Sequence, residues 1–228
     1  PYLCRPSRAP EAVPTARRPF VGSYFQSRIG LIMNPKFATL LLFFLVPTGV
    51  FSAPGTDFAV GKSPARITFG GEHVWVTNAG SHTVTKIRTS DAATIGEYPV
   101  GQAPVGITFD GENIWVANRS GGTVSKLRAS DGETLGTFVL GSEPFGITHD
   151  KAHIWVTQRQ SNTVTKLRAS DGEIVGVFDV GKVPVAVVSD GKDLWVANRD
   201  AHTVNKMQTD GTILETIEVG RTPVGLTF

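Results

Sequence analysis

The sequence is short of thiols. Its one cysteine, Cys4, lies near the start of the 228-residue chain. Residues 54–228 therefore hold no thiol, which excludes disulfides, thiolate catalysis and cysteine-based metal sites from this stretch. Its stability must come from the burial of apolar side chains and from hydrogen bonding within sheets.

Long apolar runs are also scarce. The only one runs from Phe37 to Val46 and is interrupted by a single threonine. A short basic segment precedes it and small residues follow it, which is the layout of a secretory signal peptide. The run has about half of the roughly 20 apolar residues that a membrane-spanning helix needs. We therefore expect a signal peptide at 33–53, a non-native upstream or disordered leader at 1–32, and an exported domain at 54–228, which would be periplasmic, secreted or on the cell surface.

Charge of one sign does not dominate the expected domain. Residues 54–228 hold 16 of the 22 basic residues and 19 of the 20 acidic residues, which gives a formal charge near −3. The net charge of +2 for the whole chain arises from residues 1–53. The bulk charge of the domain thus gives no argument for binding to nucleic acid or to an anionic membrane.

Helical periodicity is absent as well, because no window shows apolar residues every 3.6 positions. The sequence has instead a repeat of forty residues that occurs four times. Its markers are Gly61, Gly101, Gly141 and Gly181; Pro64, Pro104, Pro144 and Pro184; Trp75, Trp115, Trp155 and Trp195; and Lys86, Lys126, Lys166 and Lys206. The fourth copy is one residue shorter, and a fifth starts at Val219.

Each copy predicts four short strands. In the second copy they are residues 106–109, 114–117, 123–127 and 134–138. Asp-Gly pairs between strands predict hairpin turns, because glycine adopts positive φ at no steric cost. The second strand is apolar on both faces, which suits a sheet that is covered on both sides. Four strands in about 40 residues is the length of a propeller blade, so the predicted fold is an all-β propeller.

The predicted propeller has four complete blades and two partial ones. The complete blades are 61–100, 101–140, 141–180 and 181–219; the flanking strands are 55–60 and 220–228. Joining the two flanking strands would give a closing blade of only two strands. We therefore expect a piece of a larger propeller, with seven blades the favoured number, and a five-bladed ring is the alternative. An arc of four blades would expose two apolar faces, so we expect the chain alone to associate or to be poorly soluble.

The segments WVTN at 75–78 and WVAN at 115–118, each followed by a Thr-Val pair, resemble the YVTN-type propeller repeat. That family includes bacterial periplasmic YncE-like proteins and archaeal surface-layer proteins. The resemblance covers 55–228 and implies the fold more than a function, because propellers serve binding, scaffolding and several enzyme chemistries. Streptogramin lyases share a similar pattern, but their second strand typically reads WFTE. Gluconolactonase-type propellers hold a channel metal with carboxylates, and the expected channel positions here carry none.

Residues that recur in every copy are most simply structural. We expect the four tryptophans to be core residues between blades rather than a stacking platform for sugars or bases. The asparagines that end the second strands are Asn78, Asn118 and Asn198, with Gln158 in the third copy. We expect them to bond the backbone of their own loops rather than a ligand. Basic pairs recur on the third strand, and we expect them to form a solvated sheet edge rather than a basic stripe for binding: Lys86/Arg88, Lys126/Arg128 and Lys166/Arg168.

Departures between copies are the candidates for function. Arg119, Arg159 and Arg199 share one loop offset in three consecutive copies, where the first copy has Ala79. On one face of a propeller they would form an arc suited to carboxylate or phosphate groups, and Arg66 is expected near the same channel mouth. The plainer interpretation is a set of separately solvated arginines.

Two histidines are weaker ligand-binding candidates. His82 and His202 share a loop offset but sit three copies apart. A metal site would need several histidines to converge, so no metal is expected. No serine lies in a nucleophile elbow, and no phosphate-binding loop spacing is present.

The favoured function is therefore a non-catalytic extracytoplasmic binding or scaffold protein. No cofactor is expected. The partner is unknown, and an anionic glycan or another component of the cell envelope is the candidate. Two alternatives stay open: a propeller-type lyase or lactonase whose catalytic residues lie in other blades, and a periplasmic nucleic-acid-binding protein.

Overall fold

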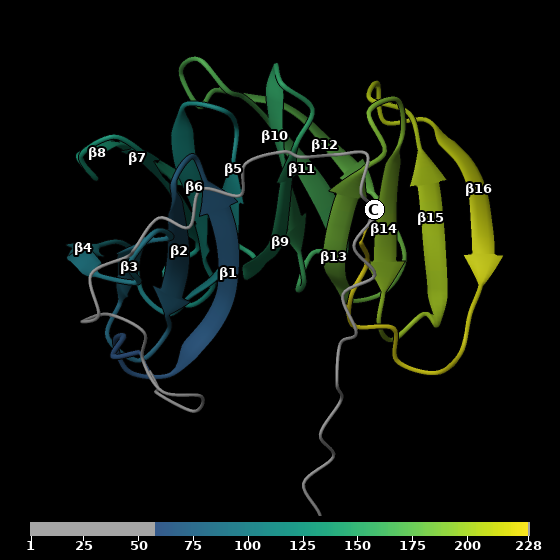
Figure 1. The fold of residues 1–228 in the computed structure, drawn as a ribbon. Coiled ribbons are helices and arrows are strands. Elements are labelled where there is room, and N and C mark those ends of the chain that lie inside the picture. The colour runs from purple at the N-terminus through teal and green to yellow at the C-terminus, as the bar shows by residue number, and fades with distance from the viewer. Residues whose placement is uncertain (1–57, 228) are drawn as a thin grey trace, which may run out of the picture. The chain divides into compact units, whose positions relative to one another are not determined.

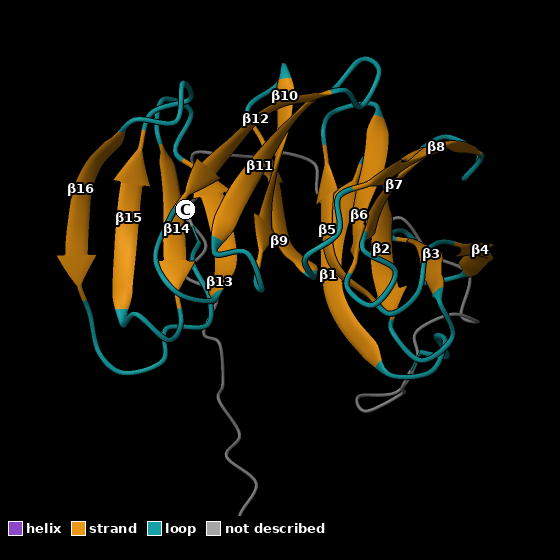
Figure 2. Cartoon of the chain, turned by 180° about the vertical axis from the view of Figure 1, so that it is seen from behind, coloured by secondary structure: helices purple, strands orange, loops and turns teal. Residues whose placement is uncertain are grey.

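The structure is a computed structural model, and it describes residues 58–227. The expected leader at 1–32 and signal peptide at 33–53 lie outside the described residues. The described residues form sixteen β-strands. Figure 2 shows strands joined by loops in this range, and no helix. Within this range there is accordingly no helix long and apolar enough to span a bilayer.

The strands form four antiparallel sheets of four, each ordered along the chain (Figure 1). Blade 1 is β1 (Pro64–Gly70), β2 (His73–Asn78), β3 (Thr83–Arg88) and β4 (Thr94–Pro99). Blade 2 is β5 (Pro104–Phe109), β6 (Asn113–Asn118), β7 (Thr123–Arg128) and β8 (Thr134–Val139). Blade 3 is β9 (Pro144–His149), β10 (His153–Gln158), β11 (Thr163–Arg168) and β12 (Ile174–Asp179). Blade 4 is β13 (Pro184–Ser189), β14 (Leu194–Asn198), β15 (Thr203–Met207) and β16 (Ile213–Glu218).

The first strand of each blade is its inner strand. The inner strands β1, β5, β9 and β13 follow one another in space in chain order (Figure 1). Residues from all four line a narrow cavity of about 180 Å³, which is the central channel of the arrangement. Inner strands approach so closely that a Cβ atom on Gly106 would lie 2.1 Å from the carbonyl oxygen of Phe145. This contact explains why a glycine is needed there.

The residue before each inner-strand proline has a positive φ. These residues are Ser63, Ala103, Glu143 and Val183, with φ between 51° and 54°, and Thr222 before Pro223 also has a φ of 54°. A left-handed backbone is costly for residues with a Cβ atom and most costly for β-branched ones such as Val183. Hydrogen bonds hold this residue on both sides: its N–H donates to Asn162 Oδ1 at 2.9 Å, and its carbonyl accepts from the Arg199 N–H at 3.0 Å.

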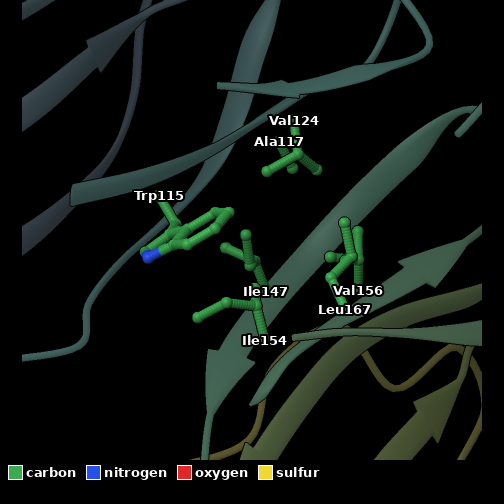
Figure 3. Close-up of a cluster of buried hydrophobic side chains, with 7 residues drawn as sticks. All are labelled: Trp115, Ala117, Val124, Ile147, Ile154, Val156 and Leu167. Atoms are coloured by element: carbon green, nitrogen blue, oxygen red, sulfur yellow. The ribbon is translucent and has the colours of Figure 1, made fainter. Parts of the chain in front are cut away.

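The hydrophobic core lies between blades. We call the face that a blade turns to the following blade its trailing face, and the other its leading face. Between blades 2 and 3, Trp115 and Val124 on the trailing face pack against Ile147, Ile154 and Leu167 on the leading face (Figure 3). The same arrangement recurs between blades 1 and 2 around Trp75 and between blades 3 and 4 around Trp155.

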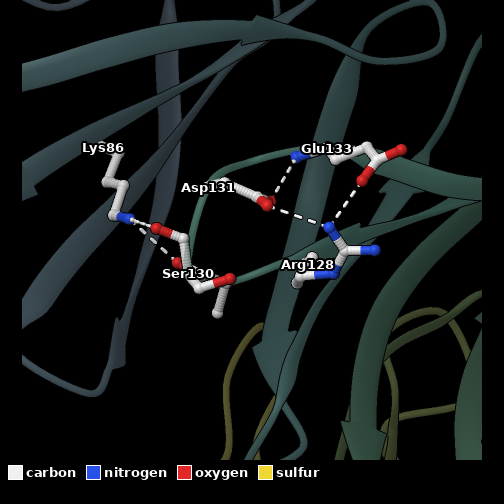
Figure 4. A network of polar contacts seen from close by, with 6 residues as sticks. Lys86, Arg128, Ser130, Asp131 and Glu133 are labelled. Carbon is white, nitrogen blue, oxygen red and sulfur yellow. Dashed lines mark hydrogen bonds and ion pairs between the residues drawn. The ribbon is translucent and has the colours of Figure 1, made fainter.

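The third-strand lysines belong to these interfaces. Lys86 is 2% exposed, and its Nζ donates to the carbonyl oxygens of Ala129 and Ser130 in blade 2 at 2.9 and 2.8 Å (Figure 4). Lys126 and Lys166 make the corresponding bonds to the blades that follow them. The expectation of a solvated edge was therefore wrong for the lysines, whereas the side chains of Arg88, Arg128 and Arg168 are 41–46% exposed.

The reason is the register of the second and third strands. Lys86 lies directly opposite Trp75 on the trailing face, so its ammonium group sits 5.2 Å from the indole centroid. Burying an ammonium group is costly unless it is paired. The two carbonyl acceptors and the indole ring together offset that cost.

The recurring asparagines also bond differently from the expectation. Asn118 Nδ2 donates to the hydroxyl groups of Thr123 and Ser125 on the third strand, at 3.0 and 2.9 Å, and not to its own loop backbone. Asn78 makes the equivalent bonds in blade 1. The Asn118 side chain packs against Gly101: a Cβ atom added to Gly101 would lie 2.6 Å from Asn118 Nδ2. The recurring glycine and asparagine are thus one packing unit.

A carboxylate fixes each tryptophan except the first. Asp110 Oδ2 accepts from Trp115 Nε1 at 2.7 Å, and the same bond recurs at Asp150–Trp155 and Asp190–Trp195. Burial pushes the pKa of Asp110 up, but N–H donors including Trp115 Nε1 outweigh this and leave that pKa below its usual value. Blade 1 has Gly70 at this position, and Trp75 Nε1 is buried without a partner.

Candidate anion-binding site

Two kinds of loop form one surface of the blades, which we call the loop face. They are the loop between the second and third strands and the loop that leads into the inner strand. They are joined by backbone hydrogen bonds at equivalent places, for example from Arg119 N–H to the Ala103 carbonyl and from Arg159 N–H to the Glu143 carbonyl. The three candidate arginines of the shared offset therefore start from the same local backbone position in blades 2, 3 and 4.

Arg159 and Arg199 line one cleft of about 380 Å³ between blades 3 and 4. We call it the arginine cleft. Its other lining residues are Glu143, Gln160, Asn162, Lys182, Val183 and Asp200. Its volume lies within the range typical of pockets for small ligands, about 300–1,000 Å³. Arg119 does not line it, so the structure brings two of the three arginines together.

Arg159 is the more enclosed of the two arginines. Its side chain is 18% exposed, and its guanidinium carbon lies 4.9 Å from the ring centroid of Phe145. Its Nη1 is 3.7 Å from Glu143 Oε2, while its buried Nε has no hydrogen-bond partner among the described residues. An aromatic ring and a carboxylate therefore hold this guanidinium in place.

Arg66 reaches the same aromatic ring from the opposite end of the repeat array. It lies on the inner strand β1 and lines the central channel, and its guanidinium carbon is 5.5 Å from the Phe145 centroid. The expected arc thus takes a different form. The structure shows a row of Arg66, Arg159 and Arg199, linked through Phe145 and across the arginine cleft.

Arg199 is paired with the neighbouring carboxylate. Its Nε and Nη2 donate to Asp200 Oδ1 and Oδ2 at 2.6 and 3.3 Å. The hydrogen bond from Arg199 lowers the pKa of Asp200, and the positive charges of Arg199 and Arg159 lower it further. The same bond raises the pKa of Arg199. Both groups therefore stay charged at neutral pH.

His82 and His202 serve as braces between blades. The Nδ1 atom of each accepts a hydrogen bond at 3.1 Å from a backbone N–H of the following inter-blade loop, that of Ala103 or Thr222. Asn162 occupies the same offset in blade 3 and accepts from the Val183 N–H in the same way. All three residues have φ near 60°. Neither histidine lines the arginine cleft, and nowhere in residues 58–227 do three or more metal-ligating side chains gather.

Three residues of this region were missed by the sequence analysis: Glu143, Phe145 and Asp200. Each departs from the repeat. Glu143 stands where other copies have serine, alanine or valine, Phe145 stands where they have alanine or valine, and Asp200 stands where they have glycine, serine or glutamine. Comparing all loop positions between copies, and not only those carrying basic side chains, could have found them.

The chain was compared with known proteins. No protein-family model matches it, and no curated protein does. Solved structures do match. The virginiamycin B lyase of Staphylococcus aureus, solved as the catalytically inactive H270A form with quinupristin, is 24% identical with a TM-score of 0.64; the match covers 77% of this chain and 61% of that one.

Two further structures are similar at lower identity. The hydrazine synthase of Kuenenia stuttgartiensis is 20% identical with a TM-score of 0.63, covering 73% of this chain and 52% of that one. A protein of unknown function from Desulfotomaculum acetoxidans is 15% identical with a TM-score of 0.65, covering 73% and 59%. This chain has the β-propeller fold. It spans between about half and three fifths of the length of these neighbours, and at such identities the likeness concerns the fold alone.

Proposed function

We propose that this chain is the binding part of an exported, non-catalytic β-propeller that captures an anionic ligand in the arginine cleft. One observation carries the proposal: Arg159, Lys182 and Arg199 line one cleft on the loop face. Residues that depart from the repeat gather around it. Departures among near-uniform copies are not needed for the blade itself, so they are free to serve a ligand.

The cleft is organised before a ligand arrives. Phe145 and Glu143 hold the Arg159 guanidinium, and Asp200 holds that of Arg199. A side chain that is already ordered loses less conformational entropy when it binds. Guanidinium groups also present several N–H donors in a fixed plane, which suits carboxylate and phosphate groups.

The same proposal includes export of the protein and its relationship to YVTN-type propellers. The pattern of 33–53 supports export to the periplasm or cell surface, and the repeat motifs support kinship with YVTN-type propellers. The similarity to longer structures supports the proposal that this chain is part of a propeller with more than four blades.

A double substitution tests the binding proposal. Arg159→Ala with Arg199→Ala should weaken the binding of an anionic oligomer at least tenfold, because a hydrogen bond to a charged group contributes about 1.5–3 kcal/mol. The measurement is calorimetric titration of the chain with oligogalacturonate, polyphosphate and single-stranded DNA. Arg119→Ala is the matched control, since it lies at the same offset outside the cleft. Equal affinities for the double variant and the control would contradict the proposal.

A second candidate is a propeller-type lyase. The structural similarity to virginiamycin B lyase favours it, and that enzyme is inactivated by a single histidine substitution. In this chain the candidate histidines His82 and His202 brace loops, and this second candidate places its catalytic residues in other blades of a larger protein. Incubation with quinupristin followed by liquid chromatography and tandem mass spectrometry separates the two candidates. A lyase that opens a ring by elimination gives a linear isomer of equal mass, which differs in retention time and fragmentation, whereas a binding module leaves both unchanged.

A further inference from the structure

We propose that the arginine cleft selects an acidic glycan, a saccharide with carboxylates among free hydroxyl groups, over a phosphorylated polymer. This inference rests on the proposed function and names the class of ligand for the same cleft. Three features support it. Carboxylates lie among the cations that line the cleft, the arginines have N–H donors that no described protein group uses, and the aromatic ring beside the cleft is covered by guanidinium groups.

The cleft is not purely cationic. Glu143 and Asp200 line it together with Arg159, Lys182 and Arg199. Two like charges 4 Å apart repel by about 1 kcal/mol in water and by about 4 kcal/mol near a protein surface. A polyphosphate offers only acceptors and closely spaced negative charges, so both carboxylates oppose it. A saccharide hydroxyl group can donate to the same carboxylates, so they favour it.

The arginines retain donors for a ligand carboxylate. A guanidinium group has five N–H donors, and Asp200 accepts from two of those of Arg199. Glu143 lies at one Nη atom of Arg159, at an ion-pair distance of 3.7 Å. Each arginine is thus held by one protein carboxylate and can bind another from a ligand. The exposed Lys182 adds a third positive charge at the rim.

At the arginine cleft, no aromatic ring is available to nucleobases. Proteins that bind single-stranded nucleic acid stack bases on aromatic side chains, at about 1–3 kcal/mol per base. Phe145 is the aromatic residue beside the cleft, and the guanidinium groups of both Arg66 and Arg159 lie over its ring. Trp75, Trp115 and Trp155 are buried between blades, and Lys206 lies over the ring of Trp195. The described residues around the arginine cleft therefore offer hydrogen bonds and charge, but no free aromatic ring for stacking.

Neutralising the two carboxylates tests the inference. We expect Glu143→Gln with Asp200→Asn to weaken the binding of oligogalacturonate five- to tenfold and to strengthen the binding of polyphosphate. Both probes are titrated into the full chain at one ionic strength, since affinities of polyanions depend on salt. A neutral oligosaccharide of equal length reports the contribution of hydroxyl groups alone.

The matched control is Glu112→Gln with Asp131→Asn. It changes the net charge equally, and neither residue lines the arginine cleft. It should affect the two probes alike and weakly. Unchanged unfolding temperatures for both double variants would show that the fold is intact.

Two outcomes would overturn the inference while leaving the proposed function standing. In the first, both probes bind through the arginines, and neutralising Glu143 and Asp200 raises the affinity for both probes equally. That result would indicate a general polyanion site. The second is tighter binding of single-stranded DNA or polyphosphate than of oligogalacturonate by the unaltered chain. If Arg159→Ala with Arg199→Ala weakened the binding of none of the probes, both the proposed function and this inference would be overturned.

Discussion

The interfaces between blades and the two outer faces of the blade array carry the same residue pattern, but only the former are covered. Ile107, Ile147 and Val187 on the leading faces of blades 2, 3 and 4 are 9%, 9% and 3% exposed. Ile67, at the same position on the leading face of blade 1, is 64% exposed. Its neighbour Phe69 is also exposed.

The trailing faces show the same contrast. The first three repeat tryptophans are buried, whereas Trp195 on the trailing face of blade 4 is partly exposed. Leu226 covers part of that face. Lys206 Nζ lies 3.2 Å from Asp193 Oδ2 of its own blade, whereas the equivalent lysines donate hydrogen bonds to the following blade.

This comparison shows that a blade does not bury its own apolar face. Burying an isoleucine side chain contributes about 1.5–3 kcal/mol, and here the neighbouring blade supplies that burial. The stability of such an array is approximately a sum of blade terms and nearest-neighbour interface terms. A substitution at an interface between blades should therefore have a larger effect than the same substitution at the equivalent position on an outer face.

The largest expected effect is at the repeat tryptophans. Trp115→Ala should lower the free energy of unfolding by about 3–5 kcal/mol, because it leaves a cavity in the interface between blades 2 and 3. Trp195→Ala should cost clearly less, because its ring is partly exposed. Urea unfolding followed by circular dichroism measures both. Equal costs would break the comparison.

An intermediate effect is expected at the buried lysines. Lys126→Met should cost about 1–3 kcal/mol, because two part-buried carbonyl groups of blade 3 lose a charged hydrogen-bond donor. Lys206→Met combined with Asp193→Asn should change stability by less than about 1 kcal/mol, because it removes the ion pair within blade 4 without leaving the buried Asp193 carboxylate unpaired. The same unfolding assay serves, and a greater loss at Lys206 would contradict the interpretation of an interface tie.

The smallest effect is a gain. Gly70→Asp should give Trp75 Nε1 the acceptor that the other tryptophans have, and should stabilise the chain by about 1 kcal/mol. The gain is limited because a Cβ at this position lies 3.0 Å from Ile114 Cδ1. Gly70→Asn is the control for crowding without charge.

The gain should depend on pH. The bond from Trp195 Nε1, together with N–H groups of Asp193 and Lys192, lowers the pKa of Asp190 to about 2, against roughly 3.9 for an aspartate in an unfolded chain. A lowered pKa stabilises the fold above about pH 4, and the effect is lost as pH falls toward 2. The benefit of Gly70→Asp over Gly70→Asn should therefore disappear across that window. A benefit that persisted below pH 2 would contradict the proposed bond.

Much of the fold was predictable because a propeller blade is a local structure. The strands predicted for the second copy correspond to β5–β8, and the apolar second strand correctly indicated coverage on both faces. Alternation along a strand and turn chemistry act over a few residues, so a sequence pattern can reveal them. The fold class was confirmed on these grounds.

The candidate site was predicted only in part. The shared offset of the arginines correctly placed them on one kind of loop, but it could not show that Arg159 and Arg199 meet across a cleft while Arg119 lies outside it. The place of Arg66 beside Phe145 depends on two residues that are two blades apart. Spacing along the chain carries no information on that distance.

The sequence by itself determined the repeat, the strand pattern and the residues that every blade uses to pack. Only the tertiary structure decided where the polar groups of those blades find partners. Lys86 and Lys206 have the same place in the repeat, yet one bonds the next blade and the other a carboxylate of its own. The physical reason is that hydrogen bonds and charges act over a few ångströms in space, and the register between blades sets those distances.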